Sequence, residues 1–292
     1  MKNRSGIDMA ASVRQRLLNL KEAKGADYNA LLTQYAIERF LYRLSVSELA
    51  DRFILKGAML FRVWAEDLRR PTQDLDLLGF GEPTPDAVAE AVRAILWTEA
   101  PDDGLMFDSD SVAAAEIREG QEYGGIRVKF LAMLGKARIP VQIDVGFGDA
   151  VVPEPVRHEF PTLLDQEAPE LRMYPPEAVV AEKLHAIVAL GMANSRMKDF
   201  YDLLILFRTH DFDEDALAKA IAATFRRRQS PIPGTLPIGL SAEYGQDARA
   251  QERWSAFLRR LQITDAPDNL AVVVAAVKSN TWPAIKKARD MC

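Results

Sequence analysis

The stretch Asp74-Leu75-Asp76-Leu77-Leu78, followed by Gly79, decides the fold. Polar and apolar residues alternate over this length, which predicts a half-buried β-strand that ends at the glycine. Because residues i and i+2 share one face of a strand, Asp74 and Asp76 point the same way, about 7 Å apart along the chain. Two such carboxylates repel each other. The pair therefore indicates either solvent-facing acids at a strand end or a site that holds a cation between them.

A second strand is predicted upstream, over the apolar run Phe53-Ile54-Leu55. This run ends in Lys56-Gly57-Ala58, and the residues from Met59 to Glu66 follow helical spacing. The pattern predicts a strand, a tight turn and a helix. A glycine in that turn allows backbone amides at a helix start to approach a phosphate closely, so Gly57 is a candidate phosphate contact.

A third carboxylate lies on a later predicted strand, which covers residues 139–147. Its apolar positions 141, 143 and 145 share one face, so Asp144 lies on the opposite face and can meet Asp74 and Asp76. Proteins hold Mg²⁺ through one or two carboxylates together with phosphate oxygens. Acids that converge on two metal ions stabilise both the attacking and the leaving oxygen of a phosphoryl transfer.

The flanking segments predict a β-containing first part and a helical second part. Helical spacing occupies residues 9–23 and 27–44, and Ser45-Val46-Ser47-Glu48 has the form of a capping box that opens a further short helix. Further elements are predicted as a helix at 85–100, strands at 111–117, 126–134 and 139–147, and helices at 176–190, 195–209, 213–229, 247–261 and 267–279. The composition changes near residues 153–159, so we expect two domains, residues 1–155 and residues 156–292.

Composition excludes several classes of protein. The chain has 292 residues, of which 48% are hydrophobic, so it is long enough to bury a sizeable core. No apolar run approaches the roughly 20 residues of a membrane-spanning helix, and we expect no secretory leader. The single cysteine, Cys292, excludes an internal disulfide and a cysteine-based metal site. We therefore expect a cytoplasmic protein without a membrane partner.

Basic residues gather in the C-terminal half of an otherwise acidic chain. The 37 basic and 42 acidic residues give a net charge of −5, which argues against bulk electrostatic coating of nucleic acid. Three compact positive clusters nevertheless occur, Arg226-Arg227-Arg228, Arg259-Arg260 and Lys286-Lys287-Ala288-Arg289. They indicate either solvated helix faces or a local basic groove.

Taken in order, the motifs resemble a known family. Gly57-Ala58, the run Arg70-x-Thr72-x-Asp74-x-Asp76 and the later Asp144 resemble the nucleotidyltransferase fold of the DNA polymerase β superfamily. More narrowly, the chain resembles the AbiEii/AbiGii toxin family through four motifs, which are Phe53-Ile54-Leu55-Lys56-Gly57, Arg70-Pro71-Thr72-Gln73-Asp74-Leu75-Asp76, Glu182-Lys183-Leu184-His185 and Ser195-Arg196-Met197-Lys198-Asp199-Phe200-Tyr201-Asp202-Leu203. The resemblance implies an α+β fold, in which a polymerase β-like nucleotidyltransferase domain with a mixed sheet precedes a helical C-terminal domain.

The resemblance also implies an activity. Members of that family are the toxins of type IV toxin–antitoxin or abortive-infection systems, and related toxins use nucleoside triphosphates to modify the 3′ end of tRNA. The expected reaction is Mg²⁺-dependent transfer of a nucleoside monophosphate from an NTP to an RNA acceptor, with a tRNA 3′ end as the implied acceptor. The expected partners are the NTP, the RNA and a cognate antitoxin encoded nearby.

Residue roles follow from the match to the family's motifs. Asp74, Asp76 and Asp144 are expected to hold the metal, and Asp144 to help activate the acceptor hydroxyl. In the helical half, Lys183 and Lys198 are expected to contact the triphosphate, and Asp202 to act in the active site. The candidate phosphate contacts around the first strand are Gly57, Ala58, Arg70 and Thr72.

Each motif residue of the helical half also has a structural interpretation. A lysine such as Lys183, placed among apolar residues of a helix, either reaches solvent or lies buried with a partner. Lys198 and Asp202 stand at i and i+4, so an ordinary helix salt bridge explains their spacing. His185 is interpreted as a helix-packing residue, because the chain's three histidines lack metal-ligand spacing.

Two other functions remain open. One is nucleotidyl transfer to a small molecule or a protein hydroxyl, which suits an acidic chain. The other is a non-catalytic module that binds a nucleotide or a partner. The retention of three neighbouring acids argues against the second, because an idle acidic cluster costs electrostatic free energy.

Overall fold

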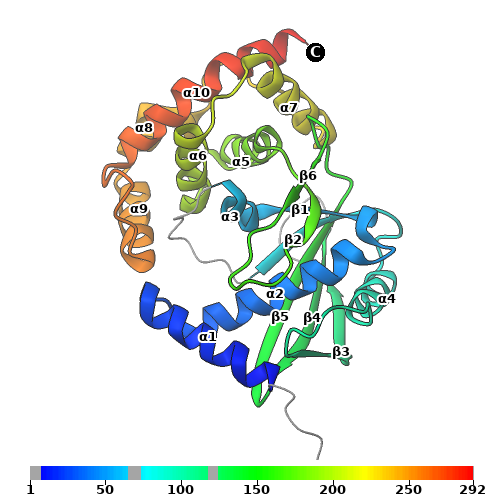
Figure 1. Cartoon of the computed structure of the whole chain (residues 1–292). Coiled ribbons are helices and arrows are strands. Elements are labelled where there is room, and N and C mark those ends of the chain that lie inside the picture. Colours follow the sequence, from blue (N-terminus) through cyan, green and yellow to red (C-terminus); the bar gives the residue numbers. More distant parts are fainter. Residues whose placement is uncertain (1–7, 65–73, 118–123, 292) are drawn as a thin grey trace, which may run out of the picture. The chain divides into compact units, whose positions relative to one another are not determined.

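The computed structural model describes residues 8–64, 74–117 and 124–291, which fall into two units. The sheet unit contains the described residues up to Gly148 together with Val156–Met173. The helical unit contains Asp149–Pro155 and the chain from Tyr174 onward. Figure 1 traces both units along the chain.

Seven strands form one mixed sheet in the order β3-β4-β5-β2-β1-β7-β6. The β2 strand runs parallel to β5, and β1 parallel to β7, while all other neighbouring strands are antiparallel. The bounds are β1 Phe53–Lys56, β2 Asp74–Gly79, β3 Leu105–Glu116, β4 Ile126–Leu134, β5 Ala137–Phe147, β6 Val156–Glu159 and β7 Glu170–Met173. The mixed sheet expected from the motifs is thus confirmed. Strands β1 and β2 are neighbours and run antiparallel.

Within the sheet unit, three helices pack on the sheet, which are α1 (Met9–Lys24), α2 (Tyr28–Val46) and α4 (Pro85–Leu96). Figure 1 shows α1 and α2, in blue, side by side. Helix α2 contacts β5 and α4 contacts β3, so the apolar sides of these helices and strands form the core. A 3₁₀ turn (Gly57–Leu60) and the short α3 (Phe61–Trp64) follow β1.

The predicted capping box at Ser45–Glu48 is wrong. Helix α2 continues to Val46, and Ser47 is its C-cap rather than a helix start. The Ser47 hydroxyl donates to the backbone carbonyl of Leu44 at 2.8 Å. The Ser45 hydroxyl donates to the backbone carbonyl of Tyr42 at 2.7 Å. A serine can satisfy a carbonyl three residues back as readily as an amide ahead, so the same residues also suit a helix end.

Strands β6 and β7 were not predicted, and they move the division between the units. Each has only four residues, too few for alternation to be recognised. Leu55 of β1 pairs with Met173 of β7, which joins this segment to the sheet unit. The structural division therefore falls after Met173, whereas the composition change predicted it at residues 155/156.

The helical unit follows the predicted pattern closely. Its helices are α5 Pro176–Leu190, α6 Met197–Thr209, α7 Glu214–Arg227, α8 Ala242–Gln246, α9 Ala248–Leu261 and α10 Leu270–Asp290. Helix α10 was expected to end at Ser279 but continues past Pro283, because Thr281, Ile285 and Ala288 extend its buried face. Within the described residues, no helix combines the length and apolarity needed to cross a membrane.

Candidate active site

One row of charged side chains crosses the sheet. The strand register aligns Lys56 of β1 with Asp76 of β2, Asp76 with Asp144 of β5, and Asp144 with Arg127 of β4. Directly opposite residues of neighbouring strands share one face, so the four side chains project from the same side of the sheet. The structure thus places Asp76 and Asp144 next to each other, as the alternation of their two strands predicted.

A second polar row lies two residues away on the same face. Asp74 is aligned with Gln142, whose side-chain amide donates to Asp74 Oδ1 at 3.1 Å. The intervening residues, Leu75 and Ile143, are fully buried on the opposite face. Asp74, Asp76 and Asp144 therefore share the one polar face of strands whose other face belongs to the core.

Asp144 is held by an arginine that sequence analysis missed. Arg127 donates from Nε to Asp144 Oδ1 at 2.8 Å and from Nη2 to Oδ2 at 2.7 Å, so it grips both carboxylate oxygens. The side chains are 41% and 19% exposed, respectively, so solvent reaches the pair. The alternation of β4 places Arg127 on a polar face, but only the register of β4 against β5 identifies its partner.

Gly57 makes room for the carboxylate of Asp76. Its φ of +75° is a left-handed conformation that L side chains rarely adopt. A Cβ on this residue would also overlap the Asp76 carboxylate. Gly57 therefore sets the position of Asp76 in addition to any phosphate contact, and Ala58 follows it in the 3₁₀ turn.

The donor set suits a hard divalent cation at two of the three acids. Asp74 is exposed and Asp76 half-buried on one strand face, and carboxylate oxygens are ligands that Mg²⁺ prefers. Within the described residues, no group of three or more histidine, cysteine or acidic side chains is arranged to hold a metal. Both Asp144 oxygens already accept hydrogen bonds from Arg127. Arg70 and Thr72 lie outside the described residues.

The helical unit contains a separate cluster of buried charges. Lys183 of α5 donates from Nζ to Asp202 Oδ2 at 2.7 Å and to Asp199 Oδ1 at 3.1 Å, both on α6. Arg196 donates from Nε to Asp199 Oδ2 at 2.5 Å. Both aspartates are 0% exposed, and the lysine side chain is only 14% exposed. Lys183 is therefore a buried lysine with partners, which its position among apolar residues left open.

The balance of charge in this cluster controls Asp199. Burial alone would raise its pKa, but Lys183 and Arg196 outweigh burial and hold the pKa of Asp199 below its usual value. Lys183 and Arg196 thus place two positive charges against the two carboxylates. In addition to any contact within α6, Asp202 binds Lys183 of a neighbouring helix, and the Lys198 side chain is exposed on α6.

His185 has a structural role in the helical unit. Arg228 can only donate, so His185 Nδ1 accepts its hydrogen bond at 3.1 Å, and Nε2 must carry the proton that is donated to Ser230 Oγ at 2.9 Å. Burial and the Arg228 charge lower the pKa of His185 to about 4, so the ring is neutral at pH 7. In this tautomer His185 cannot act as a base toward Ser230, which agrees with its interpretation as a packing residue.

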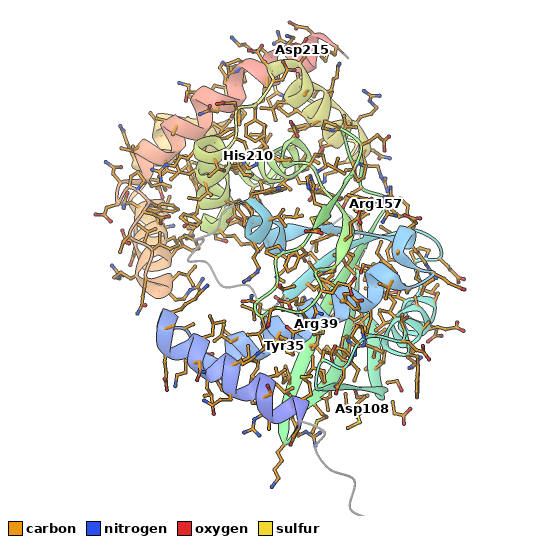
Figure 2. All side chains as sticks on the ribbon, viewed as in Figure 1. Tyr35, Arg39, Asp108, Arg157, His210 and Asp215 are labelled. Atoms are coloured by element: carbon orange, nitrogen blue, oxygen red, sulfur yellow. The ribbon has the colours of Figure 1, made fainter. Side chains whose placement is uncertain are left out.

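A buried network in the sheet unit was not predicted at all. Glu38 and Arg39, adjacent on α2, are 0% and 3% exposed, and Figure 2 labels Tyr35 and Arg39 on this helix. Glu38 Oε2 accepts from the Leu163 amide at 2.7 Å, and Arg39 Nη2 lies 3.3 Å from Oε1. Burial outweighs these contacts and raises the pKa of Glu38 to about 7.

Comparison with known proteins finds one matching protein family and similar solved structures. Residues 39–285 match the protein family described as "Nucleotidyl transferase AbiEii toxin, Type IV TA system". A crystal structure of a candidate nucleotidyltransferase from H. pylori is similar, with a TM-score of 0.50 and 14% identity over 91% of this chain and 99% of that one. The structure of JHP933 from Helicobacter pylori gives a TM-score of 0.48 and 13% identity over 90% and 94% of the two chains. No curated protein matches.

Proposed function

Because the chain belongs to the AbiEii family of nucleotidyltransferase toxins from type IV toxin–antitoxin systems, we propose that it transfers a nucleoside monophosphate from an NTP to an RNA acceptor, a tRNA 3′ end. The observation that carries the proposal is the row of acids in the sheet unit. Asp76 and Asp144 are register neighbours, and Asp74 lies on the same polar face. The family match supports the reaction class, and the motif residues support the roles below.

In this proposal Asp74 and Asp76 hold Mg²⁺ together with the NTP phosphates. The bound ion neutralises phosphate charge and lowers the pKa of an oxygen that it contacts. The acceptor hydroxyl oxygen forms a bond to the α-phosphorus, the bond to the bridging oxygen of the β-phosphate breaks, and pyrophosphate leaves. Asp144 helps to remove the proton of the acceptor hydroxyl and serves as third metal ligand once Arg127 releases it.

Residues near the turn after β1 are proposed to bind the phosphates. The backbone amides of Gly57 and Ala58 are proposed to do so, and Arg70 and Thr72 to contribute side chains. In the helical unit, Lys183 and Lys198 are proposed to contact the triphosphate, and Asp202 to orient Lys183 through their 2.7 Å hydrogen bond. A cognate antitoxin encoded nearby is the expected protein partner.

The test is label transfer with each of the four α-labelled NTPs, Mg²⁺ and total tRNA. Wild-type protein should label RNA, and Asp76→Asn should reduce the rate by about a thousandfold or more without lowering the melting temperature, since it removes one of several neighbouring negative charges. Asp110→Asn is the matched control, because Asp110 is an exposed aspartate of β3 in the same sheet.

Three outcomes would contradict the proposal. Near-normal turnover in Asp76→Asn would show that Asp76 does not hold the metal. Label on the protein or on a small molecule, with none on RNA, would favour the alternative acceptors. The absence of any transfer from the wild-type chain with Mg²⁺ would favour a non-catalytic nucleotide-binding module.

A further inference from the structure

Two basic clusters that are distant in the sequence contribute to one cleft of the helical unit. Arg226, in the last turn of α7, and Arg289, in the last turn of α10, both line a cleft of about 600 Å³. The remaining lining residues are Ala222, Ser230, Pro231, Ile232 and Met291. The volume lies within the range of pockets that bind small ligands, and the wall combines two guanidinium groups with mostly apolar side chains.

The charge of Arg226 in this cleft is not balanced by a neighbour. Its side chain is exposed, and it forms no ion pair within the part of the chain that the structure describes. Arg289 donates from Nη1 to the carbonyl of Gly234 at 3.2 Å, and its Nη2 lies 3.2 Å from Asp290 Oδ1. Nε of Arg289 also lies 3.4 Å from Asp290 Oδ1. Both members of that pair are exposed, so solvent weakens it and a phosphate can compete with Asp290 for the guanidinium.

Other members of the same two clusters are already engaged. Arg228 donates to His185, and Lys287 pairs with Asp215, a residue of α7 that Figure 2 labels. The fold thus directs one arginine from each of these two clusters into the cleft and uses neighbouring cations to join helices.

We propose that this cleft binds a single-stranded segment of the RNA acceptor, with a phosphate on Arg226 and Arg289 and the attached nucleoside against the apolar wall. The identity of the acceptor rests on the proposed function. Planar guanidinium groups match phosphate oxygens in pairs and also stack on bases. A folded protein partner would instead bury about 800 Å² on each side, spread over a surface rather than confined to a cleft.

The test is titration of labelled total tRNA into the full chain at several salt concentrations. The double variant Arg226→Gln/Arg289→Gln should lose about tenfold in affinity at low salt. The slope of log K against log salt should decrease in magnitude by about 1.5 to 2. Each phosphate contact releases counterions when it forms, so a variant that lacks two contacts releases fewer of them. Lys219→Gln/Lys278→Gln is the matched control: it removes two exposed charges from the same two helices, outside the cleft, and should leave the slope nearly unchanged.

Equal losses in the two double variants would mean that RNA responds only to overall charge, and unchanged slopes in both would place the RNA elsewhere. Either result would contradict the proposal that the cleft binds RNA. Polyglutamate that binds with the same arginine dependence, while tRNA does not bind, would identify an acidic protein segment as the occupant and also overturn it. Failure of the proposed activity is distinct, because it would leave arginine-dependent tRNA binding in place without label transfer.

Discussion

The two units resolve the repulsion between neighbouring carboxylates in opposite ways. In the sheet unit, Asp74 and Asp76 lie on a polar face that solvent reaches, and Arg127 contacts both carboxylate oxygens of Asp144. In the helical unit, Asp199 and Asp202 are 0% exposed and receive hydrogen bonds from Lys183 and Arg196. A carboxylate that solvent reaches can exchange its contacts for an ion from solution, whereas a buried carboxylate depends on protein cations to balance its charge.

Burial alone does not decide how a carboxylate behaves. Glu38 and Asp199 are both 0% exposed, yet the pKa of Glu38 is raised to about 7 and that of Asp199 is lowered. Lys183 and Arg196 contact Asp199 at 3.1 and 2.5 Å, whereas one arginine lies 3.3 Å from Glu38. Burial outweighs the arginines near Glu38, whereas Lys183 and Arg196 outweigh the burial of Asp199.

The largest expected effect comes from removing the central cation of the helical unit. Lys183→Met leaves two buried carboxylates without their shared partner, so the free energy of unfolding should fall by about 3 to 5 kcal/mol. Adding Asp202→Asn should recover part of this loss, because one uncompensated charge is removed with it. Urea unfolding of the wild type and of both variants measures the three free energies.

Lys219→Met is the control, since Lys219 is exposed on α7 and should cost less than about 0.5 kcal/mol. A loss below about 1 kcal/mol in Lys183→Met would show that the cluster does not depend on this lysine for its charge balance. Activity measured on Lys183 variants must therefore be compared at equal amounts of folded protein.

A smaller effect is expected from Glu38, which should make the free energy of unfolding fall as pH rises. Its folded pKa of about 7 lies above the ordinary value of 4.5, so the protonated form is favoured by folding. The resulting stability is fully present below pH 4.5 and is lost as pH rises through 7. Glu38→Gln should remove this dependence, and the variant should gain about 2 to 3 kcal/mol relative to wild type between pH 4 and pH 8.

Urea unfolding across that pH range tests the difference between the two proteins. A difference that stays constant with pH would mean that folding does not shift the pKa of Glu38. Asp199→Asn provides the comparison, because its lowered pKa predicts stability that is lost only as pH falls below its ordinary range of titration.

Local pattern predicted the elements and the polar face of the sheet. Alternation placed Asp74, Asp76 and Asp144 on polar faces, and helical spacing located α5 and most of the helical unit. The partners could not be predicted in the same way. Whether Asp144 meets Arg127 depends on the register of β4 against β5, which no residue within either strand encodes.

The helical unit teaches the same lesson. The i, i+4 spacing of Lys198 and Asp202 predicted a pair within one helix, and it gave no sign that Lys183 of the neighbouring α5 also contacts Asp202. Spacing describes only one helix at a time. Glu38 and Arg39 gave no signal either, because their burial depends on the segment around Leu163, which lies far away in the sequence.

The smallest expected effect concerns Arg127, whose pair with Asp144 is partly exposed. Arg127→Gln should change the free energy of unfolding by less than about 1 kcal/mol, because solvent screens such pairs. The same change releases the two Asp144 oxygens and removes a positive charge beside the proposed metal ligands. We therefore expect the Mg²⁺ concentration for half-maximal transfer to fall roughly two- to fivefold.

Activity titrated with Mg²⁺ measures this shift, and Arg138→Gln is the control, since Arg138 is an exposed arginine of β5 in the same sheet. If Asp144 binds metal, only the Arg127 variant should need less Mg²⁺. If both variants respond alike, the metal site senses only the total charge of the sheet face. An increased Mg²⁺ requirement in Arg127→Gln alone would show that the arginine positions Asp144 for the metal rather than competing with it, and the pair would then be part of the assembled site.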